Sequence, residues 1–148
     1  MQAESLATIR RLRLHEEACF ESLGRATGGD PATVIQLDVV ARHHAWRAAQ
    51  WAGLEAAGPE GEAPTWLEAL LAPSVAAEGE GGALDRWATT TAVTLAAAYD
   101  RLADEVDAVS GGPVRRVAER CRADLELDRG EVRRLLAGDG VPERRVGG

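Results

Sequence analysis

Two of the three histidines in the sequence, His43 and His44, are adjacent and lie in the middle of a long stretch of helical character. Imidazoles are common metal ligands, and their charge changes near neutral pH. Asp30 is suited to cap a helix and Pro31 to its first turn, so the pattern predicts a helix over residues 31–57. Heptad spacing places His44 in the apolar stripe of this helix, with His43 beside it. The other members of the predicted stripe are Val34, Leu37, Ala41, Ala48 and Trp51.

A carboxylate that can face this stripe lies on the preceding predicted helix, over residues 3–24. Glu16 falls in a heptad-spaced apolar stripe, and the short turn that follows makes the two helices antiparallel neighbours. Glu16 and His44 therefore lie at similar heights. We expect a buried, mutually hydrogen-bonded pair, because leaving either group without its partner would cost several kcal/mol. The apolar members of the first stripe are Leu6, Ile9, Phe20 and Leu23.

The same residues also fit a second interpretation, a mononuclear metal site. Two imidazoles and a carboxylate form a known metal-binding face, so Glu16 and His44, joined by His15 or His43, are candidate ligands for iron, manganese or zinc. Asp128, in the apolar stripe of the last predicted helix, is a further candidate carboxylate. The buried pair is the simpler interpretation, and with it we expect no cofactor. His43 is then a partly exposed neighbour rather than a ligand.

The two cysteines are candidates for thiol chemistry. Cys19 lies one helical turn after His15 and would be activated only if it were exposed beside the imidazole. Cys121 falls in an apolar stripe and is expected to be a small buried hydrophobe. The pair lacks Cys-x-x-Cys spacing and the amino terminus lacks an apolar leader, which predicts free thiols in a cytoplasmic protein. No third residue completes a catalytic set, so nucleophilic catalysis is not predicted.

The helical pattern predicts one all-α domain over residues 1–137, a four-helix bundle of two helical hairpins joined by a long crossover. A crossover of this length can return the chain to the end from which it started, so the third helix need not run antiparallel to the second. Residues 138–148 lack apolar periodicity and are predicted to be a disordered tail. The further elements are helices over residues 83–109 and 113–137, and a crossover over 58–82 with a short helix at 65–71.

Two helical hairpins joined in this way, with Glu16 on the first helix and His44 on the second, resemble the ferritin-like superfamily. In that superfamily a Glu from each of two helices and a Glu-x-x-His motif from each of the other two hold a pair of metal ions. Glu16 matches the first-helix Glu, and His44 matches the His of the second-helix motif. The resemblance implies a ferritin-like topology with a degenerate metal site.

The sequence departs from the superfamily at several ligand positions. The Glu expected three residues before His44 is Ala41, and the residue three before His43 is Val40. The third predicted helix has no Glu in the middle of its stripe and the fourth has no His, although Asp128 can supply a carboxylate. Each missing carboxylate removes a bridging oxygen and a negative charge that offsets the metal ions. We therefore expect a non-catalytic bundle that acts in binding or assembly. The alternative is an iron- or manganese-dependent oxidase or hydroxylase, similar to the tRNA-hydroxylase branch of the superfamily.

Composition narrows the range of partners. The formal net charge of −7 argues against nucleic acid, because phosphate binding rests on a basic surface. No apolar run reaches the roughly 18 residues needed to span a bilayer, so no membrane contact is expected. The four Trp residues are expected to anchor the core or an interface, and an apolar helix face predicts a homodimer. An unidentified protein or small molecule is the further partner, and a small molecule would need a cavity between the hairpins.

Overall fold

All regular secondary structure in the described part of the chain is helical, which confirms the predicted all-α class. The computed structural model describes residues 3–26, 29–75, 82–107, 109 and 111–138. The predicted disordered tail falls almost wholly on residues 139–148, which lie outside the described residues. Within the described ranges, no helix is both long enough and apolar enough to cross a membrane.

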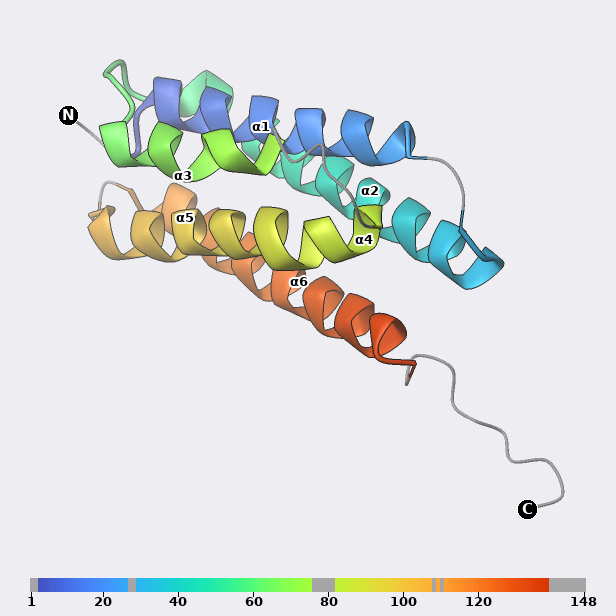
Figure 1. The fold of residues 1–148 in the computed structure, drawn as a ribbon. Coiled ribbons are helices and arrows are strands. Elements are labelled where there is room, and N and C mark those ends of the chain that lie inside the picture. Colours follow the sequence, from blue (N-terminus) through green and yellow to red (C-terminus); the bar gives the residue numbers. More distant parts are fainter. Residues whose placement is uncertain (1–2, 27–28, 76–81, 108, 110, 139–148) are drawn as a thin grey trace, which may run out of the picture.

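Two helical hairpins form the body of the fold. Helix α1 (Leu6–Gly24) packs along α2 (Pro31–Ala52), and α5 (Ala92–Glu105) packs along α6 (Gly112–Leu136). In Figure 1, α2 and α5 run in the same direction, and the chain between them carries α3 (Thr65–Val75) beside α1 and α5. The crossover therefore returns the chain to its starting end before the second hairpin begins.

The second helix is shorter than its predicted span of residues 31–57. Asp30 caps its beginning as expected, and its carboxylate accepts a hydrogen bond of 2.8 Å from the backbone N–H of Thr33. The predicted end is wrong, because α2 stops at Ala52 with Gly53 at the C-cap, and Glu55–Ala57 forms a separate 3-10 turn, η1. Glycine is a poor helix former, which accounts for the stop. The predicted short helix at 65–71 instead continues to the end of α3.

The sequence predicts one continuous helix over residues 83–109. The structure instead interrupts this helix and ends it earlier. It consists of α4 (Ala83–Arg86), a π-helical segment η2 (Trp87–Thr91) and α5, and the chain becomes extended after Glu105. A π turn contains one extra residue and changes which side chains face inward, and such segments are frequent at functional sites. Trp87 and Thr91 are both buried here.

The core includes most of the predicted stripe positions but not all of them. Phe20 and Val34, both assigned to stripes, are 42% and 49% exposed, whereas Leu12 and Cys19 are buried. A straight α-helix drifts by about 20° per heptad from a strict seven-residue repeat, so a strict heptad assignment misplaces some inward-facing positions. Trp51 is fully buried, as expected for a core anchor.

Candidate functional site

The centre of the fold holds a buried carboxylate with three hydrogen-bond partners. Glu16, from α1, is fully buried, and its Oε1 lies 2.6 Å from Nδ1 of His44 on α2. Its Oε2 accepts hydrogen bonds from Nε of Arg47 at 2.7 Å and from the hydroxyl of Tyr99 on α5 at 2.9 Å. The predicted Glu16–His44 pair is therefore present, as part of a larger set. We call this set the Glu16 network, which comprises Glu16, His44, Arg47, Trp51, Trp87 and Tyr99.

The hydrogen bonds of His44 define its protonation state. Nε1 of Trp87 lies 2.8 Å from Nε2 of His44, and an indole N–H can only donate. Nε2 must therefore be the acceptor, and Nδ1 carries the proton that it donates to Glu16. Burial lowers the pKa of His44, which keeps the ring neutral. Nη2 of Arg47 lies 3.2 Å from Nδ1, but two donors face each other there and no hydrogen bond forms.

The charges of the network are carried by Glu16 and Arg47. Burial alone would raise the pKa of Glu16, but the Arg47 guanidinium and the hydrogen bonds from His44 and Tyr99 together hold it below its usual value. Burial works to lower the pKa of Arg47, and attraction to Glu16 and neighbouring carboxylates instead holds it above its usual value. Burial raises the pKa of Tyr99, whose hydroxyl also accepts from Nε1 of Trp51 at 3.1 Å. The network is a fully buried ion pair whose carboxylate also accepts from the neutral donors His44 and Tyr99.

His15 and Cys19 form a neighbouring buried pair on α1. Both are buried, with Sγ of Cys19 3.6 Å from Nε2 of His15. Burial lowers the pKa of His15 to about 4 and raises the pKa of Cys19 far above its usual value. Burial also raises the pKa of Cys121 to about 12. Both thiols are free and protonated at neutral pH, so the conditions for an activated Cys19 are not met.

A second group of polar side chains lies where α2 packs against α6. Nδ1 of His43 lies 2.7 Å and 2.9 Å from the two carboxylate oxygens of Asp128, and Asp124 lies one turn earlier on α6. One ligand atom from each of these residues falls within 4.8 Å of the others. We call His43, Asp124 and Asp128 the α2/α6 cluster. Burial raises the pKa of Asp128, and His43 acts in the opposite direction.

Arg47 joins the α2/α6 cluster to the Glu16 network. Its Nη1 donates to Oδ2 of Asp124 and lies 3.6 Å from Oδ2 of Asp128, while its Nε is bonded to Glu16. A single buried guanidinium thus contacts three carboxylates on two other helices. The Arg47 side chain therefore links the Glu16 network directly to the α2/α6 cluster.

The structure divides the predicted ligand set into separate groups. Glu16 and His44 are together in the interior, and His43 and Asp128 are together at the α2/α6 contact. His15 lies beside Cys19.

Sequence reasoning missed four of the residues that build these groups. Two of them carry a spacing signal: Arg47 follows His44 by three positions, and Asp124 precedes Asp128 by four, so each shares a helix face with its partner. The other two, Trp87 and Tyr99, lie on distant segments and carry no such signal.

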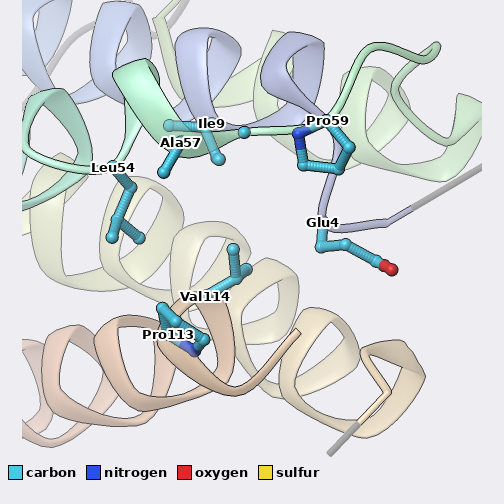
Figure 2. Close-up of a pocket in the computed structure, with 8 residues that line it drawn as sticks. Glu4, Ile9, Leu54, Ala57, Pro59, Pro113 and Val114 are labelled. Atoms are coloured by element: carbon cyan, nitrogen blue, oxygen red, sulfur yellow. The ribbon is translucent and has the colours of Figure 1, made fainter. Parts of the chain in front are cut away.

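Two cavities lie away from the histidines. Figure 2 shows an apolar cavity of about 60 Å³ at one end of the fold, where η1 and the start of α1 face the start of α6. Binding sites for small molecules usually measure about 300–1,000 Å³, so this space is too small for such a ligand. Its lining comprises Glu4, Ile9, Leu54, Ala57, Gly58, Pro59, Pro113 and Val114. A more open groove of about 360 Å³ lies between η2 and α6, with Arg129 and Arg133 on its rim.

Comparisons of the chain with protein-family models, curated proteins and solved structures gave no match. A fold alone is a weak guide to function, so the chemistry of the two polar groups must indicate it.

Proposed function

We propose that the chain is a ferritin-like four-helix bundle that has no metal centre in its interior and acts by binding or assembly as a cytoplasmic homodimer. The observation that carries this proposal is the complete hydrogen bonding of Glu16 and His44. Both oxygens of Glu16 and both ring nitrogens of His44 are engaged by protein groups. His44 has no free ring nitrogen left to coordinate an ion, and three hydrogen bonds already use most of the acceptor capacity of Glu16.

Arg47 supports the same proposal, because it supplies positive charge where a ferritin-like metal ion would supply it. The guanidinium lies 2.7 Å from Glu16 and is fully buried. Breaking a buried ion pair by removing one partner costs roughly 3–5 kcal/mol, so the folded interior requires Glu16 and Arg47 together. We infer that Glu16 and His44 hold the two hairpins together and take no part in catalysis.

Exposed apolar side chains on the first hairpin support self-association. Trp46 is 39% exposed and Ile35 is 64% exposed, and Trp is enriched in protein interfaces. The α5/α6 hairpin exposes fewer large apolar side chains in its described helices. Those exposed on the α1/α2 hairpin are Leu14, Phe20, Val34, Ile35 and Trp46.

Sedimentation velocity of the full chain over a range of concentrations tests the assembly proposal. We expect a homodimer that dissociates when Ile35→Glu and Trp46→Glu are combined, because the charges would be buried unpaired in the interface. Leu127→Glu, on α6 and 71% exposed, is the matched control and should leave the dimer intact. A wild-type monomer at every concentration, or a dimer insensitive to the double variant, would contradict the proposal.

The competing function is an iron- or manganese-dependent oxidase or hydroxylase that uses Glu16, His44 and Asp128. Oxygen consumption after anaerobic loading with Fe²⁺ separates the two. We expect no oxygen uptake above that of iron in buffer, since His44 offers no free nitrogen. Uptake that is present in the wild type and lost in His44→Gln would establish the oxidase instead.

A further inference from the structure

We propose that His43, Asp124 and Asp128 form a binding site for one divalent metal ion, with Zn²⁺ preferred, at the contact of α2 with α6. The site is distinct from the interior position of a ferritin-like centre, because it uses the other histidine of the adjacent pair. It rests on four features of these residues: donor geometry, access from solvent, local charge and outer-shell support.

The donor atoms are already close to a coordinating arrangement. Two ligand atoms of one Zn²⁺ ion, with bonds of about 2.0–2.2 Å, stand roughly 3 Å apart. Nδ1 of His43 lies 2.7 Å and 2.9 Å from the oxygens of Asp128, and all three side chains offer ligand atoms within 4.8 Å of one another. Asp124 and Asp128 are four residues apart on α6 and so share a face. One imidazole with two carboxylates is a donor set that suits Zn²⁺.

Exposure of two of the three side chains lets an ion enter and leaves room for water. The side chain of His43 is 40% exposed and that of Asp124 is 26% exposed, whereas Asp128 is held at 3%. Zinc sites with three protein ligands keep a fourth position for water or another ligand. The buried carboxylate fixes the position of the ion, and the other two ligands close over it from solvent.

The local charge favours a divalent cation. Three carboxylates, those of Glu16, Asp124 and Asp128, contact the single guanidinium of Arg47, which leaves a net charge of about −2 because the hydrogen bonds of His44 keep that ring neutral. Within the described ranges, the other basic side chains that contact these carboxylates are the imidazoles of His43, on Asp128, and His44, on Glu16. A bound divalent ion brings the sum to zero.

Arg47 leaves the coordinating oxygens free and orients the carboxylates. Its Nη1 engages Oδ2 of both Asp124 and Asp128. Oδ1 of Asp128 faces His43, and Oδ1 of Asp124 makes no hydrogen bond to the described residues. Outer-shell partners of this kind position metal-binding carboxylates. On binding, Nδ1 of His43 gives its proton to solvent, and its lone pair then coordinates the ion.

Isothermal titration of the full chain with ZnCl₂, after removal of metal by a chelator and dialysis, tests the proposal. We expect one Zn²⁺ per wild-type chain, and a binding enthalpy that changes with the ionisation enthalpy of the buffer because a proton is released. His43→Ala and Asp124→Asn should each weaken binding at least about tenfold. Both side chains are partly exposed, so the variants should fold, which circular dichroism verifies.

Glu126→Gln is the matched control. Glu126 lies on α6 between the two aspartates and pairs with Arg122 on the exposed face, so its loss removes the same charge from the same helix. Binding within about twofold of the wild type is expected for this variant if coordination rather than general attraction holds the ion. The proposal is overturned by an absence of saturable binding, by equal weakening in Glu126→Gln, or by full affinity in His43→Ala.

Discussion

The adjacent histidines have opposite environments, although one helix carries both. His44 is fully buried and both of its ring nitrogens are engaged, whereas His43 is 40% exposed and only its Nδ1 is bonded within the described residues. Successive residues of an α-helix point about 100° apart, so one step along α2 moves an imidazole from the interior to the α2/α6 contact. The two residues are of the same type, so the group that faces the second ring nitrogen of each determines what that histidine can do.

That second partner is an indole in one case and solvent in the other. Trp87 donates to His44 and consumes the lone pair that a metal ion would need. The carboxylate of Asp128 accepts from Nδ1 of His43 at a partly exposed position, where solvent can take up that proton and leave the Nδ1 lone pair for a metal ion. A closed network stabilises the fold, and an open cluster can bind a ligand. Variants in each group test this difference.

The largest effect is expected from Glu16→Ala, which breaks the closed network. It leaves Arg47 buried without its strongest partner, so the free energy of unfolding should fall by roughly 3–5 kcal/mol. Urea denaturation followed by circular dichroism measures this change. The neighbouring Glu17→Ala, whose side chain is 45% exposed, should change stability by less than about 1 kcal/mol. A loss below about 1 kcal/mol for Glu16→Ala would show that the network is not a structural centre.

The next effect is a pH dependence that His15 introduces. Burial lowers its pKa to about 4 in the folded protein from 6.5 when unfolded, so below pH 6.5 the unfolded chain binds the extra proton first. Stability should therefore fall between pH 6.5 and 4, by up to about 3 kcal/mol, with no contribution above that window. Urea denaturation at several pH values in this range compares the wild type with His15→Leu. In the variant, the free energy of unfolding should no longer fall with this part of the pH dependence. Identical slopes would be inconsistent with a buried neutral His15.

Trp87→Phe removes one hydrogen bond of the closed network and keeps most of the ring. The acceptor nitrogen of His44 is then left buried without a donor, at a cost of about 1–3 kcal/mol. Trp66→Phe is the control, because its Nε1 donates to the exposed Glu105 and water can replace that bond. Thermal unfolding should show a larger loss of stability for Trp87→Phe than for Trp66→Phe. Equal losses of stability would contradict a structural role for the hydrogen bond from Trp87 to His44.

The smallest effect is expected from Asp124→Asn in the open cluster. Asp124 is partly exposed and Arg47 keeps its bond to Glu16, so the metal-free protein should lose only about 0.5–1 kcal/mol. Urea denaturation in the presence of a chelator measures it. A loss as large as that of Glu16→Ala would mean that both groups are equally structural, and the contrast between them would fail.

The sequence predicted the helical class and the Glu16–His44 contact because both follow from periodicity along the chain. Heptad spacing and a short turn were enough to bring those two side chains to the same height. The spacing alone did not reveal that His43 would face Asp128, since this depends on how α2 and α6 are rotated against each other. The π-helical segment was equally hidden, and it contains Trp87, which closes the network.

The helix ends show the same limit. The apolar pattern continues beyond Gly53 and so predicts a longer helix, whereas α2 ends at Ala52. Tertiary contacts decide such ends as much as local propensity does.

The long-range ¹H–¹⁵N spectrum of the histidine rings, recorded with and without Zn²⁺, tests the central claim most directly. The account predicts that His44 is a neutral ring with its proton on Nδ1, and that its signals do not move when Zn²⁺ is added, while those of His43 do. A His44 ring that is protonated on Nε2, or that shifts on saturation with Zn²⁺ as a ligand would, contradicts it.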